Sequence, residues 1–256
     1  MKERLNMKKL TIIKILSALV LINPLSSYAI LNGVAVTANE YSTSPVVGIY
    51  TQVSDNSPIR MCTGTLLNPA TILTAAHCFE GINSRVIKVF RSLNLYSPNR
   101  VEIKISSNQV TIHPKYDSVY DLYDFAVIKL NQPISLTESV VYPVLANSAD
   151  FENFIFYGYG RDLNGKAGLL NKVTKNKSKI LSPKFGRENF LEFDQTDLTG
   201  QSKGDSGGPV FAFAGSTRYL VSVTCCNNGI SGEIYGTESG FFTKVSSVLA
   251  WIKSYM

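Results

Sequence analysis

Ser206 lies in the segment of the chain best suited to covalent chemistry, the hexamer Gly204-Asp205-Ser206-Gly207-Gly208-Pro209. Glycines beside a serine allow backbone dihedrals that other residues avoid, and they let a substrate approach the backbone closely. Two backbone N–H groups of such a turn can point at one spot and stabilise a developing oxyanion. The hexamer therefore indicates a serine nucleophile, with a glycine turn that has no catalytic role as the alternative.

A serine nucleophile needs a general base that titrates near neutral pH, and the whole chain contains only 2 histidines. One is His77, in Thr74-Ala75-Ala76-His77-Cys78. The other is His113, whose backbone is steered toward extended structure by Pro114 and which suits an ordinary loop equally well. His77 is thus one of two candidates for the base, and a structural role is the alternative for each.

Asp124 is the candidate for the residue that orients this base, because it heads the apolar run Phe125–Leu130. An acid at the head of a buried strand is costly unless it is hydrogen-bonded, and an imidazole would supply the partner. Asp117 and Asp121 are rival orienters, but they lie in a polar, tyrosine-rich loop where solvation is the easier explanation.

These candidates are carried by short β-branched and aromatic runs that Asn, Pro, Gly and Ser separate, a pattern typical of β-sandwiches and β-barrels. The expected strands cover residues 46–50, 63–67, 86–90, 101–105, 125–130, 154–157, 210–213 and 219–223. One helix is expected at the end of the chain. It begins at Ser246 or Ser247 as cap and carries apolar residues at helical spacing, namely Val248, Leu249, Trp251, Ile252 and Tyr255.

The net charge of +6 over 256 residues invites a nucleic-acid or anionic-membrane partner. Most of that charge, +4, lies in residues 1–29, where a basic start precedes the apolar run Ile15–Ile22 and the small-residue end Ser27-Tyr28-Ala29. This pattern predicts a secretory signal peptide. A membrane anchor is the alternative, but the run is too short for roughly 30 Å of hydrocarbon.

The 227 residues after this leader hold 20 bases and 18 acids, so their net charge is only +2. We therefore expect no nucleic-acid partner. The loop-like segment 161–190 is rich in lysine, and we interpret it as a solvated face rather than an anion-binding patch. The hydrophobic share of 45% excludes a disordered or collagen-like chain.

Export would place the 4 cysteines, Cys62, Cys78, Cys225 and Cys226, in an oxidising compartment that permits disulfides. Their spacing contains no C-x2-C pair, which disfavours a zinc site. We interpret Cys62 and Cys78 as structural cysteines in a disulfide.

Taken together, the motifs resemble those of the trypsin/chymotrypsin-like serine proteases. The order His77, Asp124, Ser206 matches, at separations of 47 and 82 residues, as do T-A-A-H-C, D-F-A-V-I-K-L and G-D-S-G-G-P. Further similar segments are residues 30–33, 112–116 and 240–245 and the terminal Trp251-Ile252, so the resemblance covers nearly all of residues 30–256.

The resemblance implies an all-β fold of two antiparallel six-stranded β-barrels with a C-terminal α-helix. The first barrel would cover about 30–140 and the second, with the helix, about 141–256. The active site would lie between them and would contain His77, Asp124 and Ser206 as a catalytic triad. The N–H groups of Gly204 and Ser206 would form the oxyanion hole, and Cys62 would pair with Cys78.

The same resemblance implies a serine endopeptidase that acts on protein or peptide substrates without a metal or a cofactor. We expect a secreted or periplasmic monomer with no membrane anchor once the leader has been removed. The family's calcium loop has no counterpart, because no Asp or Glu occurs between Glu80 and Glu102. A protease-fold binding protein that has lost catalysis is the alternative function.

Activation in this family depends on a freshly cut N-terminal amine that pairs with the acid before the nucleophile, here Asp205. Signal cleavage after Ala29 would itself expose the amine of Ile30. We therefore hypothesise that the enzyme has no separate propeptide. Cleavage after Ala35 or Ala38 instead would delete Ile30 and leave Asp205 without this partner.

Four residues correspond by resemblance to the pocket for the residue before the scissile bond: Gly200 at the floor, and Ser222, Thr224 and Gly240 on the walls. Gly200 stands where a carboxylate would select Arg or Lys, so we expect an apolar preference. Thr224 in place of a glycine would narrow the pocket toward small or medium side chains. The alignment is loose here because the stretch from Ser222 to Gly240 is longer than in trypsin.

Cys225 and Cys226 lack the partner cysteine that is usual in the family, because Ser202 occupies its position. Adjacent cysteines can form a vicinal disulfide, bond to another chain or remain free. We favour the vicinal disulfide.

Overall fold

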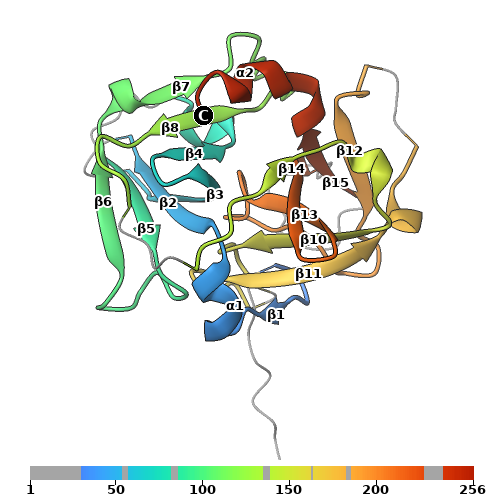
Figure 1. Cartoon of the computed structure of the whole chain (residues 1–256), viewed down its shortest axis with the longest axis horizontal. Helices are drawn as coiled ribbons and strands as arrows, with labels where there is room; N and C mark the ends of the chain where they lie inside the picture. Colours follow the sequence, from blue (N-terminus) through green and yellow to red (C-terminus); the bar gives the residue numbers. More distant parts are fainter. Residues whose placement is uncertain are drawn as a thin grey trace, which may run out of the picture.

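The β-branched and aromatic runs form two curled sheets, one from each half of the chain (Figure 1). The sheet of the first half has the strand order β6-β5-β2-β3-β4-β8-β7, with every neighbouring pair antiparallel. Its strands are β2 (Val46–Gln52), β3 (Arg60–Asn68), β4 (Thr71–Thr74), β5 (Val86–Arg91), β6 (Val101–Ile105), β7 (Val110–Ile112) and β8 (Ala126–Lys129).

The sheet of the second half has the order β1-β11-β10-β13-β14-β15-β12, and β9 pairs with β14 in parallel. Its strands are β1 (Val34–Ala35), β9 (Val144–Leu145), β10 (Asn153–Gly158), β11 (Asn171–Asn176), β12 (Phe190–Asp194), β13 (Pro209–Ala214), β14 (Thr217–Asn227) and β15 (Ser239–Lys244). An aromatic cluster that includes Phe154, Phe156, Phe193 and Phe242 fills the interior of this sheet.

This computed structural model describes residues 30–53, 57–81, 86–134, 139–162, 164–182, 186–227 and 239–256. The expected leader, residues 1–29, lies outside the described residues. Within the described ranges, no helix combines the length and the apolar character needed to cross a bilayer.

The all-β class with two antiparallel sheets is confirmed. Six strands per barrel were expected, whereas the described part of the chain has 7 strands in the first sheet and 8 in the second. The difference comes from the three shortest strands, β1 and β9 with 2 residues each and β7 with 3. Each of them pairs over only two or three residues with a longer strand.

Helical structure is limited to short pieces around the sheets: α1 (Ala38–Thr43), α2 (Leu249–Lys253) and the 3-10 turns η1 (Ala76–Phe79), η2 (Ser107–Gln109), η3 (Ser148–Asp150), η4 (Lys177–Lys179) and η5 (Val245–Val248). The C-terminal helix is confirmed, but it begins at Leu249 rather than after a cap at Ser246 or Ser247. Both serines lie inside η5, where the Ser247 hydroxyl donates back to the Lys244 carbonyl at 2.6 Å. Such a side-chain bond competes with regular helix formation.

Each end of the chain crosses to the opposite half. β1 pairs with β11, with Val34 opposite Lys172 (Figure 1). At the other end, the Tyr255 carbonyl accepts hydrogen bonds from Thr71 at 3.1 Å and from the Lys129 ammonium at 2.8 Å, both in the first sheet. The two halves are therefore held together at both ends, with the glycine turn around Ser206 between them.

Candidate active site

His77 and Asp124 are brought together by the pairing of β4 with β8. The two strands run antiparallel with Thr74 opposite Ala126, so the residues just after β4 meet the residues just before β8. His77 lies in η1, which is separated from β4 by Ala75 alone, and only Phe125 lies between Asp124 and β8. The Asp124 carboxylate accepts the His77 backbone N–H at 2.8 Å and contacts the imidazole Nδ1 at 2.7 Å. Both carboxylate oxygens are therefore used on one residue.

The electrostatics of this pair favour the imidazolium form of His77. Burial of the imidazole lowers its pKa, but the charge of Asp124, its hydrogen bond, and weaker attraction from Asp121 and Glu80 outweigh burial. The net pKa of His77 is raised above its ordinary value. Asp124 itself is 0% exposed, so the imidazole replaces the water that a carboxylate would otherwise need.

Ser206 lies in a turn that only glycine neighbours permit. Gly204 has φ +104° and Gly207 has φ +80°. A Cβ on Gly204 would lie 2.7 Å from the Gly160 Cα, and one on Gly207 would collide with the Thr74 hydroxyl. The backbone of the turn is also tied to the first sheet, because the Thr63 N–H donates to the Ser206 carbonyl at 2.8 Å. The two glycines therefore allow backbone dihedrals and a close packing against Gly160 and Thr74 that a side chain would prevent.

The N–H groups of this turn divide into two sets. Those of Asp205, Gly207 and Gly208 each donate to a backbone carbonyl, at distances from 2.7 to 3.0 Å. Those of Gly204 and Ser206 donate to no acceptor among the described residues. A pair of unused donors beside a serine hydroxyl is the arrangement that can stabilise an oxyanion.

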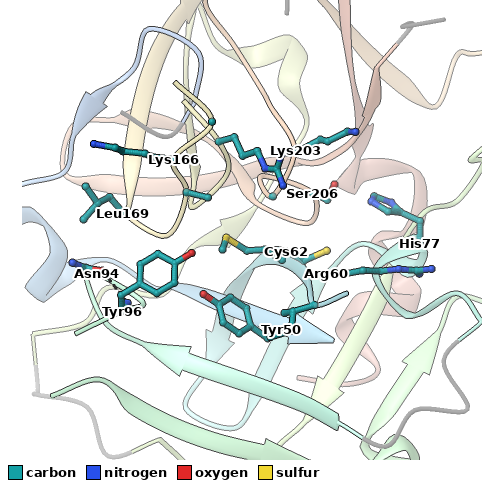
Figure 2. Close-up of a pocket in the computed structure, with 16 residues that line it drawn as sticks. Tyr50, Arg60, Cys62, His77, Asn94, Tyr96, Lys166, Leu169, Lys203 and Ser206 are labelled. Carbon is teal, nitrogen blue, oxygen red and sulfur yellow. Dashed lines mark hydrogen bonds between the residues drawn. The ribbon is translucent and has the colours of Figure 1, made fainter. Parts of the chain in front are cut away.

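Ser206 and His77 line one end of a cleft of about 840 Å³ (Figure 2). In the described part of the chain, no hydrogen bond joins the His77 imidazole to the Ser206 hydroxyl. Catalytic hydrogen bonds are often long in a protein without substrate and tighten when it binds. The three residues of the expected triad therefore lie in one site, with the His77–Asp124 contact made.

Two of the three rival residues, His113 and Asp117, have other partners. His113 is buried, stacks on Tyr123 at 5.2 Å and meets Trp251 edge-on at 4.7 Å between ring centroids. The Asp117 carboxylate accepts the N–H of Val119 at 2.8 Å, so it closes its own turn. These contacts give His113 and Asp117 structural partners. Asp121 attracts the His77 imidazolium by its charge, but Asp124 makes the direct contact with the imidazole.

Asp205 is buried beneath the turn. Its carboxylate accepts the N–H of Gly160 at 2.8 Å and of Ser202 at 2.7 Å. Burial raises its pKa to about 7, against the lowering by these hydrogen bonds. Ile30 is fully buried in the aromatic cluster of the second sheet. The ion pair between Asp205 and Ile30 needs an amine that only cleavage creates, so it stays a prediction.

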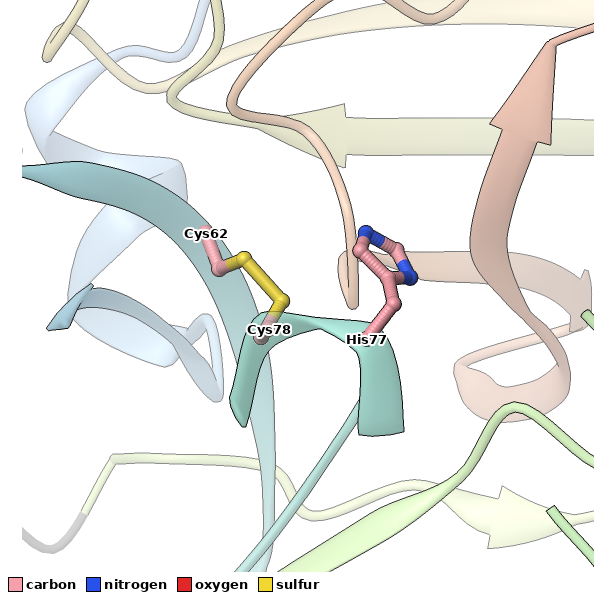
Figure 3. Close-up of side chains that lie close together, drawn as sticks. All are labelled: Cys62, His77 and Cys78. Carbon is pink, nitrogen blue, oxygen red and sulfur yellow. A yellow bond between two sulfur atoms is a disulfide. The ribbon is translucent and has the colours of Figure 1, made fainter. Parts of the chain in front are cut away.

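The disulfide between Cys62 and Cys78 is confirmed, with 6.4 Å between the two Cα atoms (Figure 3). It links β3 to η1 directly beside His77, as Figure 3 shows. Cys62, His77 and Cys78 also form a cluster of possible metal ligands, but the disulfide consumes both sulfurs.

Cys225 and Cys226 are free thiols in this structure rather than the vicinal disulfide that we favoured. Their sulfurs lie 2.7 Å apart, and burial raises the pKa of the Cys225 thiol well above its ordinary value. They lie at an irregularity of β14, because the register shifts between Thr224 and Asn227. Together with Asp121 they form a second cluster of possible metal ligands.

The expected pocket residues differ in their distance from Ser206. Thr224 is next to the turn, since its carbonyl accepts the Gly207 N–H at 2.7 Å and its own N–H donates to Gly208 at 2.8 Å. Ser222 lies two residues farther along β14, opposite Val210 and Lys244.

Gln195, which sequence reasoning missed, lies beside two of the expected pocket residues, Gly200 and Gly240. It follows β12 by one residue and is 1% exposed, and its carboxamide occupies the space that side chains at Gly200 and Gly240 would need. A Cβ on Gly200 would lie 2.5 Å from the Gln195 amide carbon. Neither amide atom of Gln195 has a hydrogen-bond partner among the described residues. No sequence signal distinguished it, because it lies in the polar stretch Asp194-Gln195-Thr196-Asp197.

Comparison with known proteins identifies similar sequences and a similar fold. The model of the trypsin family matches residues 35–252. The chain is 26% identical over 215 residues to vitamin K-dependent protein C of Mus musculus and 27% identical to that of Rattus norvegicus. Each match covers 76% of this chain and 46% of the relative, so the chain spans about half the length of these relatives. The solved structure of HL collagenase is similar with a TM-score of 0.69 at 21% identity, over 88% of this chain and 97% of that one.

Proposed function

The chain belongs to the trypsin family, and from this membership we propose that it is a secreted serine endopeptidase with Ser206 as nucleophile. The observation that carries the proposal is the double contact of Asp124 with His77, at 2.8 and 2.7 Å. It holds the Nδ1 proton toward Asp124, so Nε2 is the nitrogen left to accept a proton beside Ser206.

In the proposed mechanism, His77 removes the hydroxyl proton of Ser206 as the oxygen attacks the scissile carbonyl. The carbonyl oxygen becomes an oxyanion, which the N–H groups of Gly204 and Ser206 stabilise. The imidazolium of His77 then gives its proton to the leaving amine, and an acyl-enzyme forms on Ser206. Water, deprotonated by His77, hydrolyses this ester and restores the free hydroxyl. No step needs a metal or a cofactor.

We propose an uncharged pocket for the residue before the scissile bond, lined by Gly200, Thr224 and Gly240. Two observations support an apolar rather than a basic preference. Gly200 supplies no carboxylate, and the neutral carboxamide of Gln195 fills the space beside Gly200 and Gly240. A pocket that is shallow and uncharged favours small or medium apolar side chains over Arg or Lys.

Secretion and activation are proposed to share one cleavage. Removal of residues 1–29 would free the amine of Ile30, which would pair with the buried Asp205. The product would be a secreted or periplasmic monomer without a membrane anchor.

A fluorophosphonate probe tests the catalytic proposal, because it reacts covalently with an activated serine. We expect the protein that starts at Ile30 to be labelled and the Ser206→Ala variant to remain unlabelled. Peptide cleavage is expected to fall in this variant by on the order of 10⁶-fold. Absence of labelling in protein confirmed by mass spectrometry to start at Ile30 would instead support a binding protein that has lost catalysis.

A further inference from the structure

The cleft beside Ser206 carries four basic side chains, Arg60, Arg161, Lys166 and Lys203. All four are exposed, and none of the described residues that line the cleft is acidic. The cleft lies between a wall with Lys166 and Lys203 and a wall with Arg60, Tyr50 and Tyr96 (Figure 2). This concentration of positive charge contrasts with the near-neutral balance of residues 30–256.

Three of these charges, those of Arg60, Arg161 and Lys166, are not neutralised by an ion pair among the described residues. Arg60 donates instead to the backbone carbonyl of Glu80 at 2.9 Å. Four lysines between residues 172 and 179 behave differently, and each pairs with an acid: Lys172 with Glu40, Lys175 with Asp197, Lys177 with Glu152 and Lys179 with Asp194.

The far end of the cleft is built by both halves of the molecule. The Leu95 N–H donates to the Gly168 carbonyl at 2.8 Å, and the Tyr96 ring lies against the face of Gly168 where a Cβ would be. The Tyr159 hydroxyl donates to the Ser92 carbonyl at 2.6 Å. The basic side chains therefore project from a preformed groove, and its volume of about 840 Å³ is within the range of ligand sites.

The position of this groove indicates which part of a substrate it would hold. Its lining includes Ser206, His77 and Cys62 but not Gly200, Thr224 or Gly240, which line the proposed pocket. The groove thus extends from Ser206 away from that pocket. A peptide whose residue before the scissile bond enters the pocket would place the residues after the bond in the groove.

We propose that this groove binds an acidic segment on the leaving side of the scissile bond, so that the preferred substrates carry Asp or Glu in the first few positions after the cut. The inference rests on the proposed endopeptidase function. Carboxylates there would meet Arg60, Arg161 and Lys166, which have no acidic partner to displace among the described residues. Exposed pairs of this kind are weakened by salt.

Two matched fluorogenic peptides test the proposal with the protein that starts at Ile30. They share the residues before the bond, chosen from the enzyme's own cleavage profile, and differ after it in having three Asp or Glu residues or the isosteric Asn and Gln. We expect kcat/KM to be about tenfold higher for the acidic peptide at low salt, and the ratio to approach 1 at high salt.

Charge reversal locates the effect in the groove. Lys166→Glu is expected to lower the ratio of acidic to neutral cleavage several-fold. Lys177→Glu changes the net charge equally but lies outside the groove and serves as the control, with an unchanged ratio. Because the ratio is taken within each variant, a general loss of stability does not imitate the expected result.

Three outcomes overturn the proposal, and they can be told apart. Cleavage of both peptides at equal rates, abolished by Ser206→Ala, would support the proposed endopeptidase function and contradict the acidic preference. Inhibition by a single-stranded DNA oligonucleotide without any preference between the peptides would assign the groove to polyanions. Failure to cleave either peptide, without fluorophosphonate labelling, would remove the proposed function and this inference with it.

Discussion

Asp124 sets which nitrogen of His77 carries a proton, because both of its carboxylate oxygens already contact that residue. A base is effective only while it is neutral, so activity should be lost as the pH falls through the pKa of His77. Attraction by Asp124 raises that pKa against the effect of burial. The acidic limb of the pH–rate profile should therefore lie above the ordinary pKa of 6.5 for a histidine.

The Asp124→Asn variant separates these effects. An amide keeps the shape but removes the charge, so burial then dominates and the pKa of His77 falls. We expect the acidic limb of kcat/KM to move to lower pH, while the rate at its plateau drops on the order of 10⁴-fold because the wrong tautomer is favoured. Asp117→Asn changes a carboxylate that only closes its own turn, and it should leave both quantities unchanged. An Asp124→Asn profile that keeps its original acidic limb would contradict this account.

At the scale of elements, the pairing of β12 with β15 determines the depth of the proposed pocket. Phe193 lies opposite Gly240, and Gln195 follows at the end of β12, so its carboxamide reaches the space beside Gly240 and Gly200. Gln195→Ala removes this carboxamide from the floor. We expect the variant to gain roughly tenfold in its preference for Phe over Ala before the scissile bond, in kcat/KM with matched peptides.

The matched control for this prediction is Gln109→Ala, which alters a glutamine in the 3-10 turn η2 of the first sheet. Its Phe-to-Ala ratio should equal that of the wild type. An unchanged ratio in Gln195→Ala would mean that Gln195 does not limit the pocket.

The same elements show how far the sequence determined the site. The motifs around His77, Asp124 and Ser206 identified the candidate residues. The strands that follow Asp124 and Ser206 were predicted to within a few residues, whereas β4 (Thr71–Thr74), which leads to His77, was not predicted. The position of Ser222 was not predictable in the same way. Pairing of β14 with the Ser206 turn depends on a register shift between Val210 and Phe211, and a one- or two-residue shift is not visible in an apolar run. Gln195 was missed because its expected role depends on its contacts with Gly200 and with Gly240, and the contact with Gly240 joins residues that are far apart in the sequence.

At the scale of the whole molecule, residues 30–35 connect the first half of the chain to the second sheet and contact Gly200 of the proposed pocket. The Leu31 N–H donates to the Gly200 carbonyl at 2.9 Å, and β1 pairs with β11. Cleavage after Ala35 would remove both interactions, whereas cleavage after Ala29 would keep them. Ile30 also has φ +59°, a left-handed conformation that is strained for a β-branched residue. A cut just before Ile30 would free this residue to adopt another conformation.

The raised pKa of Asp205 provides a way to measure the effect of the cleavage before Ile30. Burial raises it to about 7 in the uncut chain, from an ordinary 3.8. Between these pH values the unfolded chain has lost the proton that the folded chain keeps, so the stability of the uncut chain should fall as the pH rises. An ammonium group of Ile30 beside Asp205 would favour the ionised carboxylate and remove this loss.

We therefore expect protein that starts at Ile30 to keep its melting temperature between pH 4 and pH 7 better than protein that starts at Ala29, and to react faster with a fluorophosphonate. One extra residue blocks the amine while it leaves every described contact available, so this pair is closely matched. A third protein that starts at Val36 should be slow in labelling and less stable, since it lacks β1 as well. Equal labelling of the Ile30 and Ala29 forms, or an exported protein whose N-terminal sequence begins at Val36 or Asn39, would show that the site forms without the Ile30 amine.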